Sequence, residues 1–338
     1  MKTLAAILVE LGRPLEVCEL EIPPLQRGQV LVEIAYSGVC HTQLLEARGQ
    51  RGDDRYLPHC LGHEGSGIVR EIGGGVTKVK SGDHVILSWI KGSGADVAST
   101  HYSSGSRRIN AGAITTFAHH SVISENRLTP MPSRAPFRES ALLGCAIATG
   151  AGAVLNVAQP RPGQSLAVFG CGGIGLSAIA AAVISQCKPI FALDIHPNRL
   201  ERAKLIGATD CLNANKASLG DLDFAIEATG QPAVMTLALK SVRARGGAAV
   251  IIGNAPHGAT LTIDPHELNL GKRFLGTWGG DTQPDRDFPK YCDWLVHGNL
   301  TLAPLLSKPF RLDQINEALA ALESGVVARP LVAMNNVS

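Results

Sequence analysis

A turn of closely spaced glycines after an apolar run constrains the fold of this chain more than any other feature. It reads Gly-Cys-Gly-Gly-Ile-Gly over 170–175, between the strand-like run 165–169 and the apolar, helix-like run 176–184. This order is typical of a dinucleotide-binding turn, in which glycines allow a tight turn, close approach to a pyrophosphate and close helix–strand packing. The helix N-terminus also presents free N–H groups to the anion. The predicted cofactor-binding residues of the turn are Gly170, Gly172, Gly173, Ile174 and Gly175.

An acidic residue completes this pattern. The strand-like run 190–194 ends in Asp194, 19 residues after Gly175. An acid at this distance accepts a hydrogen bond from the ribose 2′-hydroxyl and repels a 2′-phosphate, so we expect NAD rather than NADP. Arg199 follows the acid and is expected near the adenosine end of the cofactor.

Length and charge argue against several other classes of protein. A chain of 338 residues exceeds the size at which one hydrophobic core remains efficient, so two domains are expected. A net charge of +2 gives no electrostatic basis for binding nucleic acid or an anionic membrane, and no apolar run approaches a membrane span. The apolar run 4–9 is too short for a signal core. We therefore expect a cytoplasmic protein whose eight cysteines stay reduced.

The residue pattern changes twice along the chain. Residues 1–87 alternate apolar and polar positions between turn residues, which predicts an antiparallel β domain. Residues 89–112 are rich in Ser, Gly, Ala and Thr and are expected to form a long loop, mobile or held by contacts between subunits. A strand resumes at 117–122.

From 146 to 277, strands and helices alternate, as in a parallel sheet with helices on both faces. The expected strands are 165–170, 190–194, 222–227 and 247–252, and the expected helices are 174–187, 197–207 and 232–243. Helices near 287–297 and 313–324 and a strand at 330–334 close the chain.

Three short motifs, taken with this pattern, resemble one enzyme family. They are Gly-Val-Cys-His-Thr at 38–42, Gly-His-Glu-Gly-Ser-Gly at 62–67, and Gly-Cys at 144–145. Together with Lys-Val-Lys-Ser-Gly-Asp-His-Val at 78–85, they resemble the zinc-dependent alcohol dehydrogenases of the medium-chain dehydrogenase/reductase superfamily. The resemblance runs nearly end to end. It implies an α/β protein with a β-rich, GroES-like catalytic domain of 1–146 and 278–338, into which a doubly wound Rossmann domain of 147–277 is inserted.

The resemblance implies that Cys40, His63 and Cys145 bind a catalytic zinc. Two thiolates and an imidazole suit zinc and leave a fourth position for water or substrate. Any one of these residues alone would more readily be explained as a core cysteine or a hydrogen-bonded turn histidine; it is the three matching motifs together that favour a metal site. Many family members carry a second zinc in a lobe of four closely spaced cysteines, but no cysteine lies between Cys60 and Cys145. We therefore expect one zinc per subunit.

Further roles follow from the same resemblance. Thr42 would pass the proton of the alcohol toward the nicotinamide ribose, and Glu64 would lie behind the zinc. The other residues implied are His41 and Arg329 at the pyrophosphate, Thr149 at the nicotinamide, Ile252 in the cofactor site and Trp89 in the substrate pocket. Glu64, Thr42 and Trp89 could instead be structural. Two residues depart from the family pattern, because Gln43 replaces an aspartate that supports the zinc-ligand imidazole and Leu45 replaces a proton-relay histidine of some members.

The function predicted from the sequence is reversible hydride transfer between a small alcohol and NAD, giving an aldehyde or ketone, in a homodimer or homotetramer. Two alternatives stay open: a polyol or thiol-adduct dehydrogenase of the same superfamily, and a cofactor-binding paralogue with little activity. Nucleic acid and membrane are not expected as partners.

Overall fold

The computed structural model describes residues 1–97 and 99–334, and the chain divides into two compact units. The first comprises Met1–Cys145, Gln283–His297 and the C-terminal segment from Leu306. The second comprises Ala146–Thr282 and Gly298–Leu305.

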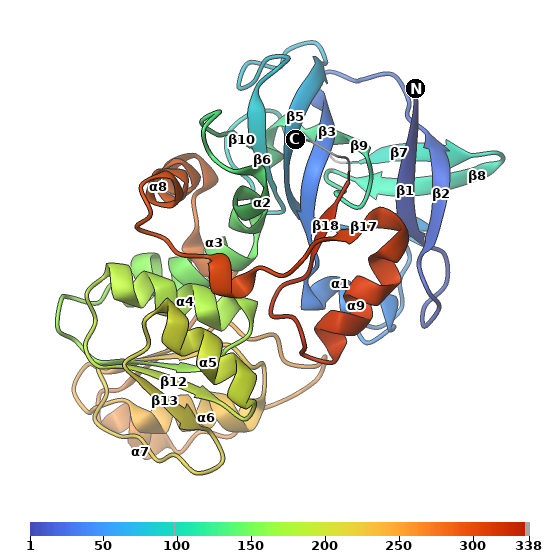
Figure 1. Ribbon diagram of the computed structural model, residues 1–338. Helices are drawn as coiled ribbons and strands as arrows, with labels where there is room; N and C mark the ends of the chain where they lie inside the picture. The colour runs from blue at the N-terminus through green and yellow to red at the C-terminus, as the bar shows by residue number, and fades with distance from the viewer. Residues whose placement is uncertain (98, 335–338) are drawn as a thin grey trace. The chain divides into compact units, whose positions relative to one another are not determined.

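The first unit contains a closed barrel. Its strands, in order around the barrel, are β1 (Lys2–Leu8), β2 (Glu16–Glu21), β7 (Thr100–Ser104), β8 (Arg107–Gly112) and β4 (His59–Cys60). Figure 1 shows β7 and β8 as a hairpin beside β1 and β2. The expectation of a loop over 89–112 is therefore wrong for its second half. The Ser- and Gly-rich composition of this segment is typical of a loop, but the segment forms a hairpin. Its inward-facing residues Tyr102 and Ile109 are buried in the barrel core.

A seven-stranded sheet forms the rest of the β structure of this unit. It consists of β10 (Leu128–Pro130), β6 (His84–Ser88), β5 (Glu64–Ile72), β3 (Gln29–Gly38), β18 (Leu331–Ala333) and β17 (Phe310–Arg311), with β9 (His120–Ser124) paired to β3. The strand expected at 117–122 thus begins later, although the Phe117 carbonyl already accepts a hydrogen bond from Ala6.

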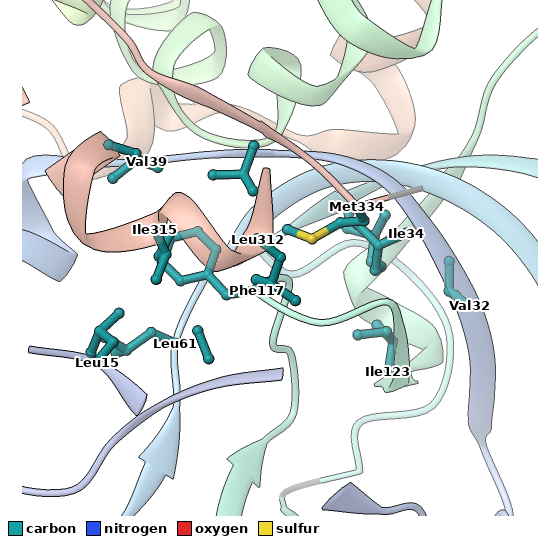
Figure 2. Packing of buried hydrophobic residues seen from close by; sticks show 14 of the residues in the cluster. Leu15, Val32, Ile34, Val39, Leu61, Phe117, Ile123, Leu312, Ile315 and Met334 are labelled. Carbon is teal, nitrogen blue, oxygen red and sulfur yellow. The ribbon is translucent and has the colours of Figure 1, made fainter. Parts of the chain in front are cut away.

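One hydrophobic core holds this sheet to segments from both ends of the chain. Figure 2 shows Leu312, Ile315 and Met334 packed beside Phe117 and Ile34. Burial of each such side chain stabilises the fold by about 1.5–3 kcal/mol. The C-terminal segment is therefore part of the same core as the N-terminal strands.

The α-helices of this unit range from 4 to 13 residues. They are α1 (His41–Ala47), α2 (Phe137–Ser140), α8 (Pro284–Val296) and α9 (Ile315–Glu323), with 3₁₀ turns η1 (Glu125–Arg127), η2 (Ala141–Gly144) and η6 (Leu312–Gln314). Helix α8 begins earlier than the predicted 287–297 because Pro284 occupies its first turn, where the missing N–H costs nothing. Helix α1 was not predicted.

The second unit is a parallel sheet in the order β13 (Asp210–Asn213), β12 (Ile190–Asp194), β11 (Leu166–Phe169), β14 (Phe224–Glu227), β15 (Ala248–Ile251) and β16 (Arg273–Gly276). All its pairings are parallel. The order reverses between β11 and β14, as in a Rossmann fold, and ligands bind at such a switch point. The predicted doubly wound sheet is confirmed, while β13 and β16 were not predicted.

Helices flank this sheet on both sides. They are α3 (Ala146–Gly152), which continues into the π-helical turn η3 (Ala153–Ala158), α4 (Gly173–Ile184), α5 (Pro197–Ile206), α6 (Pro232–Ser241) and α7 (Pro265–Asn269), with the 3₁₀ turns η4 (Gly279–Asp281) and η5 (Ala303–Leu305). Figure 1 shows α4 and α5 on one face of the sheet and α6 on the other. Among the described residues, no single helix is long and apolar enough to span a membrane; the successive helices 137–144 and 146–158 meet that criterion only as a bent pair.

Candidate metal centre and cofactor site

Three predicted metal ligands from distant parts of the sequence converge in the first unit. Cys40 follows β3, His63 precedes β5 and Cys145 follows η2. Their ligand atoms all lie within 4.8 Å of one another, a separation that one zinc ion can bridge. Both cysteines are buried and His63 is half-buried.

Glycines place two of these ligands. Gly62 has a φ of +95°, and a Cβ there would lie 2.3 Å from Oγ1 of Thr116, so only glycine makes the turn that precedes His63. A Cβ at Gly144 would lie 2.1 Å from the Leu87 carbonyl oxygen. The turn that carries Cys145 can therefore pack directly against β6, where Ser88 Oγ donates to the Gly144 carbonyl at 2.6 Å.

The His63 ring is positioned by one nitrogen and leaves the other without a partner. Its Nδ1 lies 2.7 Å from Nε2 of Gln43, whose Oε1 accepts the Cys40 backbone N–H at 2.7 Å. The Nε2 atom of His63 is buried with no hydrogen-bond partner. A buried polar atom without a partner is costly unless something binds it, and an imidazole nitrogen beside two thiols suits a zinc ion.

The buried thiols of Cys40 and Cys145 shift each other's pKa in opposite directions. The hydrogen bond from Cys145 holds the pKa of Cys40 well below its usual value, with further help from the positive charge of Arg329. The same hydrogen bond, with burial, raises the pKa of Cys145. One thiolate therefore forms readily, and a bound cation would favour ionisation of the second.

Glu64 and Arg329 form a buried ion pair behind these ligands. Arg329 is only 3% exposed and Glu64 is fully buried. Burial alone would lower the pKa of the Arg329 guanidinium, but the negative charges of Cys40 and Glu64 hold it well above its usual value. The family resemblance predicted Glu64 behind the metal and Arg329 at the pyrophosphate. In the structure the two side chains form an ion pair with each other. No short-range sequence pattern indicates this pairing.

Two other predicted residues of this unit, His41 and Thr42, directly follow Cys40 in the chain, and a third, Trp89, follows β6. Helix α1 carries Thr42, whose Oγ1 lies 3.7 Å from Sγ of Cys40, and the exposed His41. Trp89 is half-buried directly after β6, and its carbonyl accepts a hydrogen bond from Arg127. Thr42 is thus the hydroxyl adjacent to the metal ligands.

The glycine turn of the second unit has the geometry of an anion cradle. Gly170 has a φ of +91°, and a Cβ at Gly175 would lie 1.8 Å from the Gly170 carbonyl oxygen, so helix α4 packs directly on the turn. A Cβ at Gly172, by contrast, would meet nothing within 4 Å. Gly173 and Ile174 form the first turn of α4 behind it. This leaves open space at the helix N-terminus, where a pyrophosphate would bind.

Asp194 ties this turn to the next strand. Its Oδ2 accepts the Cys171 backbone N–H at 2.8 Å and its Oδ1 accepts the His196 N–H at 2.9 Å. Nη1 of Arg199 lies 3.6 Å from Oδ2. A carboxylate offers about four acceptor positions, so Asp194 retains capacity for a ribose hydroxyl.

One further acid of this unit had no role assigned from the sequence. Glu227 is fully buried at the end of β14, and its Oε1 accepts the backbone N–H groups of Thr229 and Gly230 at 2.6 and 3.0 Å. Burial raises the pKa of Glu227, against these hydrogen bonds. An acid that ends a buried strand before Thr-Gly is the signal that could have identified this turn. Of the other predicted cofactor residues, Ile252 follows β15 and Thr149 lies in α3, both buried.

Comparison with known proteins agrees with this geometry. Two family descriptions match the sequence, "Alcohol dehydrogenase GroES-like domain" over residues 26–133 and "Zinc-binding dehydrogenase" over residues 173–297. The chain is 34% identical to an S-(hydroxymethyl)glutathione dehydrogenase of Photobacterium damsela subsp. piscicida, over 98% of this chain and 100% of the relative.

Solved structures are similar over almost the whole length. An alcohol dehydrogenase zinc-binding domain protein from Burkholderia ambifaria has a TM-score of 0.90 and 30% identity, covering 99% of this chain and 100% of that one. A benzyl alcohol dehydrogenase from Acinetobacter calcoaceticus has a TM-score of 0.88 and 29% identity, with the same coverage.

Fold and site together define a metal- and dinucleotide-dependent dehydrogenase. The chain belongs to the zinc-dependent alcohol dehydrogenase family of the medium-chain dehydrogenase/reductase superfamily, as the resemblance of its motifs predicted. It is an oxidoreductase of the class that acts on alcohols, and its cofactors are zinc and a nicotinamide dinucleotide.

Proposed function

We propose that this chain is an NAD-dependent alcohol dehydrogenase that binds one catalytic zinc through Cys40, His63 and Cys145. The observation that carries the proposal is the convergence of these three ligand atoms within 4.8 Å, with the buried His63 Nε2 lacking any partner. When bound, zinc would supply a Lewis acid that favours ionisation of the alcohol, and the nicotinamide dinucleotide would supply the hydride acceptor.

The residues of the chain provide the proton path and the charge balance. Thr42 accepts the proton of the alcohol through its hydroxyl, which lies beside Cys40. The Arg329 guanidinium offsets the negative charge of the thiolates and of Glu64. No histidine stands at position 45 to pass the proton onward, so the relay from Thr42 would end at a ribose hydroxyl of a bound cofactor or at water near His41.

The cofactor we propose is NAD. The support is Asp194, a carboxylate at the end of β12 beside the glycine turn, where it would accept a ribose hydroxyl and repel a 2′-phosphate. Arg199, 3.6 Å from this carboxylate, is already engaged by it and is less available to a phosphate.

The substrate we propose is a small alcohol and its aldehyde or ketone. A second candidate, the adduct of formaldehyde with a thiol, is favoured by relatives named S-(hydroxymethyl)glutathione dehydrogenase at 33–34% identity. Both are oxidised at a carbon that bears a hydroxyl, so the same zinc and cofactor serve either.

We further propose a cytoplasmic homo-oligomer, a dimer or a tetramer. Strand β16 is an edge of the second unit's sheet, with one side unpaired among the described strands, and Leu261, Leu268 and Leu270 nearby are exposed. An edge strand with exposed apolar neighbours is a surface that a second copy can cover. All eight cysteines are unpaired, which suits a reducing compartment.

The test is activity and metal content measured on the same preparation. We expect about one zinc per chain by elemental analysis, NAD-linked oxidation of at least one member of a panel of primary, secondary, aromatic and hydroxymethyl-thiol substrates, and loss of both on chelation. Cys145→Ala is expected to abolish zinc binding, whereas Cys292→Ala, at another buried cysteine outside the ligand cluster, is expected to keep it. Zinc and NADH binding without turnover on any substrate would instead identify a cofactor-binding paralogue.

A further inference from the structure

The Gln43 carboxamide connects two of the three proposed zinc ligands. Its Oε1 accepts the Cys40 backbone N–H at 2.7 Å, while its Nε2 lies 2.7 Å from Nδ1 of His63. Gln43 is only 1% exposed, so water offers little replacement for either contact. The bond to Cys40 also caps helix α1, in which Cys40 is the N-cap and Gln43 the third helical residue.

This arrangement decides which ring nitrogen of His63 carries the proton. A carboxamide nitrogen only donates, so Nδ1 of His63 must accept, and the proton of the neutral ring is on Nε2. A metal bonds to Nε2 through its lone pair, which requires the proton to be on Nδ1 instead. The Nδ1–H group would then face the NH₂ group of Gln43, donor against donor.

Turning the carboxamide over does not remove the conflict. It directs Oε1 toward Nδ1–H of His63 but sets the NH₂ group against the Cys40 N–H, which then loses its acceptor. The carboxamide oxygen and nitrogen lie on opposite sides of their carbon, so one oxygen cannot serve both donors from this position. An aspartate or glutamate has no such conflict, because both of its oxygens accept.

We propose that Gln43 is a positioning residue that makes zinc binding compete with the capping bond of α1. Without metal, Gln43 holds His63 as the Nε2–H tautomer and pairs with the Cys40 N–H. With zinc bound, the ring proton is on Nδ1, the carboxamide is reversed and the Cys40 N–H is unpaired. The ring has one proton in both states. This inference rests on the proposed zinc site, and it predicts weaker zinc affinity than a carboxylate at position 43 would give.

Gln43→Glu tests this directly, because it replaces only the NH₂ group by an acceptor oxygen. Partners of a ligating histidine change metal affinity by about 10–100-fold, so we expect Gln43→Glu to bind zinc more tightly by that factor in competition with a chromophoric chelator. Gln50→Glu is the matched control, since it adds the same charge at an exposed residue shortly after α1. Its zinc affinity is expected to equal that of the wild type.

A second measurement observes the hydrogen bonds themselves. In wild-type protein labelled with ¹⁵N-histidine and ¹⁵N-cysteine, zinc loading is expected to convert His63 from the Nε2–H to the Nδ1–H tautomer. The Cys40 amide proton is expected upfield of its position in zinc-loaded Gln43→Glu, where it keeps an acceptor. The wild-type comparison with and without zinc does not depend on whether the variant folds.

Two sets of outcomes are distinguishable. The inference is overturned if wild type and Gln43→Glu bind zinc equally, if Gln50→Glu gains as much as Gln43→Glu, or if His63 is already the Nδ1–H tautomer without metal. Failure of the proposed zinc site gives a different result: no protein in the series binds zinc, or Cys145→Ala binds it as tightly as wild type.

Discussion

Arg329, near the C-terminus, donates its Nε–H to Oε1 of Glu64 across 2.7 Å, and both side chains are almost completely buried. The pair joins the strand that follows His63 to the segment that precedes β18. Because both charges have been removed from water, each depends on the other for compensation.

Removal of the arginine alone is therefore expected to be severe. Arg329→Leu should lower the free energy of unfolding by about 3–5 kcal/mol, because it leaves the Glu64 carboxylate buried and unpaired. Glu64→Gln combined with Arg329→Leu should recover part of the loss. Urea unfolding of the metal-free protein followed by circular dichroism measures both.

An exposed ion pair gives the matched control. Arg311 pairs with Asp313, and their side chains are 75% and 53% exposed. Arg311→Leu should leave the free energy of unfolding almost unchanged, because water solvates both charges of this pair. Equal losses from Arg329→Leu and Arg311→Leu would contradict the role given to the buried pair.

A second prediction concerns the hydroxyl beside the metal ligands. Thr42→Val keeps the shape of the side chain but removes the group proposed to accept the proton of the alcohol, so kcat should fall by about 10²–10⁴-fold. Thr42→Ser should recover most of it. Zinc content and NADH affinity should not change in either variant, and unchanged turnover in Thr42→Val would leave Thr42 as a structural hydroxyl only.

A third prediction concerns cofactor choice. Asp194→Asn replaces one acceptor oxygen by a donor that faces the Cys171 or His196 N–H and weakens the contact with a ribose hydroxyl. A hydrogen bond to a charged group contributes about 1.5–3 kcal/mol, so weakening the contact with the ribose should lower kcat/KM with NAD by about 10–100-fold. With NADP the fall should be smaller, because a repelling charge is lost at the same time. Asp210→Asn, at an exposed acid of the same sheet, should leave the ratio of NAD to NADP kcat/KM unchanged.

The sequence predicted the structure best where the elements of a motif are consecutive in the chain. The glycine turn at 170–175 lies between β11 and α4 as predicted, because the strand, the turn and the helix are consecutive in the chain. Cys40, His63 and Cys145 are far apart in the sequence, and only the family resemblance could group them. Their convergence depends on the pairing of β3, β5 and β6, which no residue pattern specifies.

The features missed by the sequence analysis depend on tertiary contacts. Helix α1 has only seven residues, too few to show a helical period in the sequence or to be stable alone, and the Gln43 capping bond and burial of Leu44 and Ala47 stabilise it. Strands β13 and β16 are edge strands of four residues each, in which only some side chains face the core, so their apolar pattern is weak. The pairing of Glu64 with Arg329 spans 265 residues and is beyond any local rule.

Glu125 holds the segment after β6 in place. The four-cysteine zinc lobe that many family members have is missing from this sequence. The Glu125 carboxylate accepts the backbone N–H groups of Thr77, Lys78 and Ala95 at 2.6, 2.8 and 2.7 Å. Burial of the carboxyl acts to raise its pKa, but these three donors and the charge of Lys78 outweigh burial, so the net shift is downward. The buried carboxylate of Glu125, in turn η1, is thus hydrogen-bonded to the backbone of two loops.

The sign of the resulting pH dependence follows from that shift. Because the pKa of Glu125 is lower in the folded state than in the unfolded chain, its contribution is complete above the unfolded pKa of about 4.3 and is lost as the pH falls through the folded pKa. Glu125→Gln keeps the size of the side chain but loses one acceptor oxygen and the charge. It should destabilise the protein by about 1–3 kcal/mol at neutral pH.

The difference between wild type and Glu125→Gln should therefore shrink below about pH 4, as the wild-type carboxyl becomes protonated and loses the same hydrogen bonds. Urea unfolding at pH 7 and at successively lower pH measures this convergence. Glu317→Gln, in which the acid is on the exposed side of α9, gives the baseline for charge removal alone. A Glu125→Gln deficit that stayed constant with pH would mean that side-chain packing, and not the ionised carboxylate, holds the segment in place.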